Sequence, residues 1–331
     1  MPGMREPDGV RKIVAADIGG THARFALASI AGGDVVALDD PVTLKTGDHA
    51  SLRTAWEEFA GHHNGELPRE LAMAFAGPVG GELLKLTNNP WVIRPALMTT
   101  KLGVERHLIL NDFGAIAHAV AAFDDSAFAH LCGPDAPLPR DGVISIVGPG
   151  TGLGVAALLQ RADHYEVIET EGGHIDFAPL DPLEDQILAI LRKSFRRVSV
   201  ERIVAGSGIV NVHNALAAIE GRAVVPRDDK ALWSAAFDGS DSLAAAALDR
   251  YCLCLGAVAG DLALAQGAAA VVIAGGLGLR LKDHLPRSGF ANRFIAKGRF
   301  ERRMEAIPVK LVTHPQPGLF GAAAAFARTY P

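Results

Sequence analysis

Two glycine-rich turns, each set between runs of apolar residues, constrain the fold of this chain more than any other feature. The first is Asp17-Ile-Gly-Gly-Thr21 and the second is Gly148-Pro-Gly-Thr-Gly-Leu-Gly154. Apolar segments of strand length precede and follow each turn, so both predict a β-hairpin. Glycine can adopt a positive φ and lets a ligand approach the backbone, and successive amides in such turns can bind an anion. The pair therefore predicts two phosphate-binding turns and points to phosphoryl transfer.

Neither turn has the pattern of a single-loop nucleotide motif. Gly-Lys-Ser/Thr does not occur in the chain, and neither turn has the G-x-G-x-x-G spacing of dinucleotide-binding loops. Each turn carries one threonine, whose hydroxyl adds a donor. Asp17 at the start of the first turn predicts a Mg²⁺ ion bound beside the phosphates, through water.

Length and charge limit the classes of protein that fit. With 331 residues, 49% of them hydrophobic and 21% charged, the chain can form two globular domains. The formal net charge is −5, and no run of Lys and Arg is longer than two. This pattern disfavours a nucleic-acid partner, which calls for a basic patch or stripe.

The chain carries no pattern typical of export or of a membrane span. Its three cysteines, Cys132, Cys252 and Cys254, predict neither a disulfide framework nor a metal site. Residues 1–8 are charged where a signal peptide needs an apolar core. The most apolar stretch, 262–279, contains several glycines and predicts a buried helix followed by a buried strand. We therefore expect a cytoplasmic protein without a membrane partner.

Strands and helices alternate along the chain and predict an α/β fold. We expect a small lobe over residues 1–123 and a large lobe over 124–317. The helix at 318–331 is expected to pack back on the small lobe. A loop rich in Pro and Asp over 124–141 is the candidate boundary. Because each lobe begins with a glycine-turn hairpin, the two resemble a distant internal duplication.

Asn111 and Asp112 follow a predicted strand over 106–110 and precede an alanine-rich helical segment over 113–123. Ligands of open α/β sheets gather at the carboxyl ends of strands. A kinase that phosphorylates an alcohol needs a carboxylate to accept the hydroxyl proton, and Asp112 fits this role. The alternative is that the aspartate only caps the helix.

Glu171-Gly-Gly-His174 and Glu201 form the third group of polar residues, with an amphipathic segment over 185–197 that predicts a helix between them. A carboxylate accepts hydrogen bonds from adjacent hydroxyls, and histidine donates or accepts. This combination favours polyol binding. A metal site fits less well because further ligands are missing, and Glu201 alone could be a solvated residue at a helix start.

Together and in order, these motifs resemble the bacterial ATP-dependent glucokinase family, within the hexokinase/actin-like ATPase superfamily. The resemblance covers residues 13–326 and is carried by 17–24, 110–113, 148–154, 171–179, 199–202 and 274–276. It implies a two-lobed ribonuclease-H-like fold with a mixed β-sheet in each lobe, glucose and ATP in the cleft, and a homodimer.

The resemblance also implies the roles of individual residues, with Asp112 as the base for the sugar 6-hydroxyl. The implied sugar ligands are Asn111, Asp112, Glu171, His174 and Glu201, with Asn88 or Asn89 near them. The implied ATP-binding residues are Ala16, Asp17, Ile18, Gly19, Gly20, Thr21, Gly150, Thr151, Gly152, Gly275 and Gly276, with Mg²⁺ near Asp17. His22 stands where the family commonly has Asn, so the hydrogen bonding of the first turn is expected to differ.

The expected reaction is ATP-dependent phosphorylation of D-glucose to glucose 6-phosphate, the entry to glycolysis. A kinase for fructose, mannose or an amino sugar is the nearest alternative, because such sugars differ by few hydrogen bonds. A non-catalytic sugar-sensing protein is a remote one. Residues 178–182 contain no cysteine, which disfavours the related repressor-type kinases that carry a cysteine-rich zinc loop after the histidine.

Overall fold

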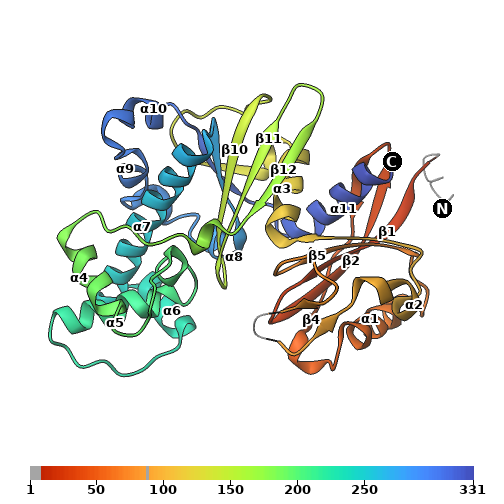
Figure 1. The fold of residues 1–331 in the computed structure, drawn as a ribbon, viewed down its shortest axis with the longest axis horizontal. Coiled ribbons are helices and arrows are strands. Elements are labelled where there is room, and N and C mark those ends of the chain that lie inside the picture. The colour runs from red at the N-terminus through yellow and green to blue at the C-terminus, as the bar shows by residue number, and fades with distance from the viewer. Residues whose placement is uncertain (1–8, 87–88) are drawn as a thin grey trace. The chain divides into compact units, whose positions relative to one another are not determined.

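The computed structural model describes residues 9–86 and 89–331. The chain divides into two compact units, and Figure 1 labels many of their elements. Unit 1 contains the chain up to Asp124 together with His314–Pro331, and unit 2 is Asp125–Thr313.

Unit 1 is built on a mixed sheet with the strand order β3-β2-β1-β5-β8, and β4 also pairs with β2. Its strands are β1 (Arg11–Ile18), β2 (His22–Ala31), β3 (Asp34–Leu38), β4 (Val42–Lys45), β5 (Glu70–Phe75) and β8 (Arg106–Asn111). β1 and β2 are antiparallel, as the first glycine turn predicts, whereas β5 and β8 run parallel to β1. A separate two-stranded ribbon consists of β6 (Leu84–Lys85) and β7 (Val92–Ile93).

Helices cover both faces of this sheet. They are α1 (Leu52–Gly61), α2 (Met98–Leu102), α3 (Asp112–Ala122) and α11 (Pro317–Thr329). Side chains of β1 alternate between two cores: Val14 packs with Trp56 of α1, and Ile13 packs with Phe326 of α11. The end of the chain thus returns to the first strand, where α11 lies beside α3 (Figure 1).

Unit 2 has a second mixed sheet, with the strand order β12-β11-β10-β13-β14-β9. Its strands are β9 (Phe128–Cys132), β10 (Gly142–Pro149), β11 (Leu153–Gln160), β12 (Tyr165–Thr170), β13 (Ala270–Ile273) and β14 (Val309–Val312). β10, β11 and β12 form an antiparallel meander, and β13 and β14 run parallel to β10. The first five strands in this order repeat the arrangement β3-β2-β1-β5-β8 of unit 1, as the duplicated hairpins predict.

The 25-residue helix α7 forms the core of the helical layer of unit 2. The helices are α4 (Pro182–Leu191), α5 (Gly208–Ile219), α6 (Asp229–Asp238), α7 (Ser242–Gln266), α8 (Gly275–Arg280), α9 (Phe290–Ile295) and α10 (Glu301–Glu305). By length and composition alone α7 could cross a membrane, but 72% of its most apolar window is buried inside the structure. Cys252 and Cys254 of α7 are free thiols in this core, as is Cys132 of β9 at its edge.

Short 3-10 helices complete both units. They are η1 (Thr46–Asp48), η2 (Pro95–Leu97), η3 (Asp125–Ala127), η4 (Gly172–His174), η5 (Val200–Arg202), η6 (Leu285–Arg287) and η7 (Gly298–Phe300).

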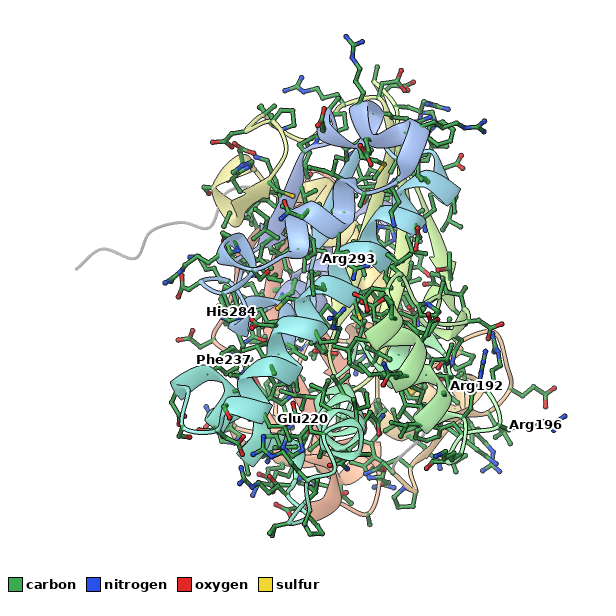
Figure 2. All side chains as sticks on the ribbon, turned by 90° about the vertical axis from the view of Figure 1, so that its left-hand side faces the viewer. Arg192, Arg196, Glu220, Phe237, His284 and Arg293 are labelled. Carbon is green, nitrogen blue, oxygen red and sulfur yellow. The ribbon has the colours of Figure 1, made fainter. Side chains whose placement is uncertain are left out.

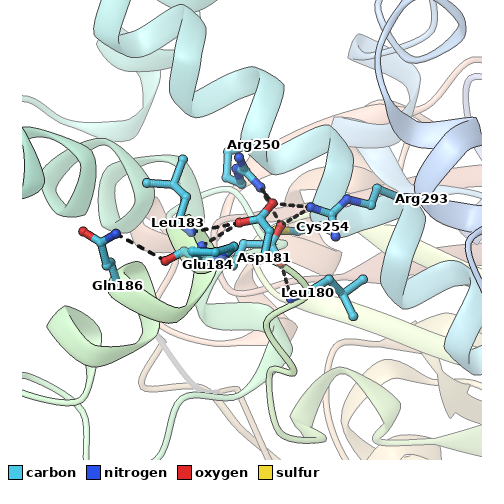
Figure 3. A network of polar contacts seen from close by, with 9 residues as sticks. Leu180, Asp181, Leu183, Glu184, Gln186, Arg250, Cys254 and Arg293 are labelled. Carbon is cyan, nitrogen blue, oxygen red and sulfur yellow. Dashed lines mark hydrogen bonds and ion pairs between the residues drawn. The ribbon is translucent and has the colours of Figure 1, made fainter.

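An ion-pair network links three helices of unit 2 (Figure 3). Asp181 caps α4 by accepting hydrogen bonds from two of its first amides, and Glu184 lies one turn further on. Arg250 of α7 donates to both carboxylates, at 2.5 Å and 2.8 Å, and Arg293 of α9 contacts the same two carboxylates. Glu184 is 2% exposed. Because its charge is paired twice, the network fixes the start of α4 against α7 and α9.

Two expectations need correction. The segment 124–141 is not only a loop, because it contains η3 and the edge strand β9, which pairs with β14 far along the chain. The helix expected over 185–197 is α4, which begins at Pro182 and ends at Leu191. Proline at the first helical position and the aspartate cap before it favour the earlier start.

Candidate active site

The first glycine turn is fixed by two neighbouring backbone segments. The Gly19 amide donates to the His22 carbonyl at 2.9 Å and closes the turn. Thr46, which is buried, donates its hydroxyl to the Gly20 carbonyl at 2.7 Å and its amide to the Thr21 carbonyl at 3.1 Å. Among the described residues, no acceptor faces the amides of Gly20 and Thr21. The turn thus offers two adjacent donors.

Asp17 lies beside this turn in a partly desolvated position. Arg24, its partner on β2, approaches the carboxylate at 3.2 Å. Burial raises the pKa of Asp17, and the Arg24 charge opposes that rise. A Cβ at Gly318 of α11 would lie 3.2 Å from the Asp17 carboxyl carbon. The side chains of Ala16 and Ile18 are both buried in the core that contains Val14 and Trp56, so only their main chain could contact a ligand.

Asn111 ends β8 at the same edge of the sheet. Ile18 of β1 pairs with Phe75 of β5, and Phe75 pairs with Asn111, all in parallel register. The Asn111 carboxamide oxygen accepts from the amide of Phe113 at 2.9 Å and caps α3. The cap is therefore the asparagine and not Asp112, and Asn111 also donates to the Gly77 carbonyl at 3.3 Å.

Asp112 is the first residue of α3 and follows β8 directly. One of its carboxylate oxygens accepts from the Phe113 amide at 3.0 Å. Unit 1 thus brings Asp17, the first turn and Asp112 to one edge of the sheet, at the carboxyl ends of β1 and β8, which are parallel and flank β5. Asn88 lies outside the described residues; its neighbour Asn89 accepts from the Trp91 amide at 2.9 Å.

The second glycine turn is fixed in a similar way in unit 2. The Gly150 amide donates to the Gly152 carbonyl at 2.9 Å, while the Gly150 carbonyl accepts from Gly206 at 2.7 Å. The Trp233 indole of α6 donates to the Gly206 carbonyl at 2.8 Å. Thr151 at the tip is exposed, and in the part of the chain that the structure describes the amides of Thr151 and Gly152 meet no acceptor.

Gly275 and Gly276 begin α8 next to this turn. β13 runs parallel to β10 and pairs Ile273 with Val147, so the segments that follow both strands are neighbours. Gly275 has a φ of +82°, and a Cβ there would lie 2.8 Å from the Pro149 carbonyl. Glycine is therefore required at this position for both its conformation and its close approach.

The reason for glycine in the two turns differs from the one that the sequence suggests. Gly19, Gly20, Gly150 and Gly152 all have a negative φ. Positive φ is thus the wrong explanation for these four positions. At Gly152 the reason is space, because a Cβ would lie 2.9 Å from a carboxylate oxygen of Glu201.

Glu171, His174 and Glu201 come together in unit 2. The His174 imidazole lies 4.0 Å from the Glu171 carboxylate and 3.6 Å from that of Glu201. A Cβ at Gly173 would lie 1.9 Å from the Leu153 carbonyl, so only glycine lets this loop pack on the start of β11. Glu201 thus lies between the histidine and the second turn. It is 22% exposed, whereas Glu171 and His174 are open to solvent.

Sequence reasoning missed the residues that support these groups. Thr46 donates its hydroxyl to a carbonyl of the first turn, and the Trp233 indole donates to the Gly206 carbonyl beside the second turn, but neither residue lies in a motif. No pattern in the sequence singles out Thr46 or Trp233. Their roles depend on contacts between segments that are distant along the chain.

One family model and several known proteins are similar to this chain. The family model named Glucokinase matches residues 14–329. The glucokinase of Zymomonas mobilis is 63% identical over 319 residues, which cover 96% of this chain and 98% of that protein. The crystal structure of a glucokinase from an Antarctic psychrotroph is 33% identical, with a TM-score of 0.81 over 95% of this chain and 98% of that one.

A more distant structure shares the fold. It is a ROK family glucokinase from Streptomyces griseus in complex with glucose and AMPPNP, 18% identical, with a TM-score of 0.63 over 96% of this chain and all of that one. The mixed sheets and these likenesses confirm the predicted α/β fold of the actin-like ATPase type. The chain belongs to the glucokinase family.

Proposed function

We propose that this chain transfers the terminal phosphoryl group of ATP to the 6-hydroxyl of D-glucose, with Asp112 as the general base. The observation that carries this proposal is the position of Asp112 at the carboxyl end of β8, on the same sheet edge as the turn after Asp17. The Zymomonas mobilis relative supports glucose as the acceptor. The Streptomyces griseus complex with AMPPNP supports ATP as the donor.

In this reaction Asp112 accepts the proton of the 6-hydroxyl as the hydroxyl oxygen attacks the phosphorus atom. The bond between that phosphorus and the bridging oxygen of ATP breaks, and the charge passes to the ADP leaving group. The amides of Gly20 and Thr21, and those of Thr151 and Gly152, are the donors that we assign to the phosphate oxygens. Their acceptor-free state supports the assignment.

Asp17 is the residue that we assign to Mg²⁺. Within residues 9–86 and 89–331, no group of three His, Cys, Asp or Glu side chains could bind a metal. An ion at Asp17 would therefore take its other ligands from water and phosphate oxygens, as Mg²⁺ commonly does. The desolvated carboxylate of Asp17 fits a cation, since a nearby positive charge offsets the cost of ionising it. When bound, the ion neutralises phosphate charge.

The sugar ligands that we assign in unit 2 are Glu171, His174 and Glu201. Two carboxylates accept hydrogen bonds from vicinal hydroxyls, and the imidazole between them donates or accepts. Their mutual distances of 3.6 and 4.0 Å leave the polar atoms close enough to share one sugar. We assign Asn111 and Asn88 to the same sugar on family resemblance alone.

Replacing Asp112 with Asn tests the base. The substitution keeps the size of the side chain and removes its basicity, so kcat should fall by about 10²–10⁴-fold. Glucose binding, measured by calorimetry without ATP, should stay close to that of the unmodified protein. An Asp112→Asn variant that keeps more than about a tenth of kcat would refute the assignment.

A panel of hexoses tests the substrate. ADP formation, measured with glucose, fructose, mannose and glucosamine, should give the highest kcat/KM with glucose. A higher kcat/KM for another hexose would make that hexose the preferred substrate. No ADP formation with any sugar would point to a non-catalytic sugar-sensing protein.

We also propose, on family resemblance, that the protein acts in the cytoplasm as a homodimer. Light scattering should then give twice the chain mass of 34.7 kDa, and a mass of one chain would refute the dimer.

A further inference from the structure

One guanidinium binds the loop that carries His174. Arg197 donates from Nη2 to the His174 carbonyl at 2.7 Å and from Nε to the Asp176 carboxylate at 2.5 Å. Its two donors thus reach two positions of one loop and span Ile175 between them. The planar guanidinium fork suits such a two-point contact, which a lysine cannot reproduce.

The main chain beside Arg197 is paired with the same loop. The Val200 amide donates to the Ile175 carbonyl at 2.9 Å, and the Phe177 amide donates to the Val198 carbonyl at 3.0 Å. Arg197 precedes this paired stretch and Glu201 follows it. His174 is therefore fixed at both ends, its carbonyl by Arg197 and its imidazole near Glu201 at 3.6 Å.

The two glycines before His174 give the loop a flexible backbone, which the contact with Arg197 restricts. Gly172 and Gly173 carry no side chain that could restrict the backbone. On one side the loop is limited by the Leu153 carbonyl, against which Gly173 packs. Arg197 supplies the charged hydrogen bond on the His174 carbonyl, immediately after these glycines.

The other arginines of this segment make no comparable contact. Arg192 and Arg196 lie on the surface near the end of α4 (Figure 2). Among the described residues, neither side chain has a hydrogen bond or ion pair. The contact with the His174 loop is therefore specific to Arg197 and is not shared by the neighbouring arginines Arg192 and Arg196.

The fold itself has little need of this ion pair. Arg197 is 59% exposed and Asp176 is 74% exposed. Ion pairs this open to solvent contribute little to stability, because water screens them and because holding two side chains in one geometry costs conformational entropy. The contact between Arg197 and the His174 loop adds little to stability. Its position beside His174 therefore indicates a role in the candidate site and not in the core.

We propose that Arg197 is a positioning residue for the glucose site and that it acts by orienting His174 through its carbonyl. This inference rests on the proposed function, in which His174 contacts the sugar. Arg197 touches neither substrate nor reacting atoms. Its effect is therefore expected in glucose binding and not in ATP binding or in the proton transfer.

Replacing Arg197 with Met tests the proposal, because the side chain loses both donors and keeps its apolar stem. We expect the glucose KM to rise about fivefold, the upper limit of what a solvent-exposed ion pair supplies. The ATP KM should stay within about twofold, and kcat should change less than the glucose KM. Arg197→Lys keeps the charge and loses the planar fork. Its glucose KM should lie between those of the unmodified protein and Arg197→Met.

Arg196→Met is the matched control, since it removes an adjacent arginine without a partner. It should leave both KM values and the Tm unchanged. The Tm of Arg197→Met should also stay near that of the unmodified protein. An unchanged glucose KM in Arg197→Met, or equal rises of the glucose and ATP KM values, would overturn the proposal.

A double-mutant cycle shows whether Arg197 acts through His174. If it does, Arg197→Met should raise the glucose KM much less in a His174→Ala background than in the unmodified chain. Additive effects would overturn the proposal. The proposed function fails in a different way, because the unmodified chain would then form no ADP from ATP and glucose.

Discussion

Gly321 in α11 is the position at which a single methyl group should do the most damage to unit 1. A Cβ there would lie 1.7 Å from the carbonyl oxygen of Ala115 in α3, and 3.0 Å is the closest approach that real Cβ atoms show. The two backbones must therefore move apart by more than an ångström. No flexible side chain can relieve the contact, because the atom that is met belongs to a helix backbone.

The expected cost of Gly321→Ala lies at the upper end of the range for overpacked cores, about 3 kcal/mol. For a unit of this size that corresponds to a fall in Tm of roughly 6–12 °C. Activity should fall as well. Ala115 lies about one turn from Asp112, so moving α3 displaces the proposed base. Calorimetry and coupled ADP assays measure the two effects.

Gly61→Ala is the matched control for this substitution. Gly61 is the last residue of α1, is exposed, and a Cβ there would meet nothing within 4 Å. The change should be neutral or should stabilise by up to about 1 kcal/mol, because alanine favours helices over glycine. A Gly321→Ala variant with the Tm and kcat of the unmodified protein would refute the argument from close packing.

Two further predictions concern buried charge. Arg293→Met removes one cation from the network around Asp181 and Glu184, while Arg250 still pairs both carboxylates, and should lower the free energy of unfolding by about 1.5–3 kcal/mol in urea titrations; a loss below about 1 kcal/mol would show that the second cation is not needed. Burial lowers the pKa of His118 to about 4, with a smaller contribution from Arg328. The folded state therefore favours neutral His118, whose contribution to stability is present above pH 6.5 and is lost as the pH falls toward 4. Between pH 7 and pH 5 the protein should lose about 2 kcal/mol through this group, and His118→Gln should remove that part of the loss; equal losses in both proteins would contradict the assignment.

The local features of the fold are predictable from the sequence because they depend on neighbours along the chain. The two hairpins follow from a glycine turn between apolar segments, and Asp112 is placed at a strand end by the switch from strand to helix pattern. The edge strand β9 is not predictable in this way. Its five residues lie in a segment rich in Pro and Asp, and its partner is β14, far along the chain.

The supporting contacts of the candidate site are hidden from the sequence for the same reason. Trp233 reaches the second turn through Gly206, and Thr46 reaches the first turn from the end of β4. Arg197 was expected inside a helix and instead lies beyond the end of α4, where it can contact the His174 loop. In each case a side chain meets a backbone atom of a segment that only the fold brings near.

For some glycines of the site, the sequence correctly predicts that glycine is needed but suggests the wrong reason, a positive φ. Glycine is required at position 275 because φ is positive there. At Gly152 and Gly173, whose φ values are negative, glycine is required because another group lies too close for a side chain. The two kinds of close approach are not equivalent. Gly152 faces the carboxylate of Glu201, which can rotate away from an added methyl group, whereas Gly173 faces the Leu153 carbonyl, which cannot. Of these two glycines, Gly173 is therefore the less replaceable, although it lies outside both turns that first identified the site.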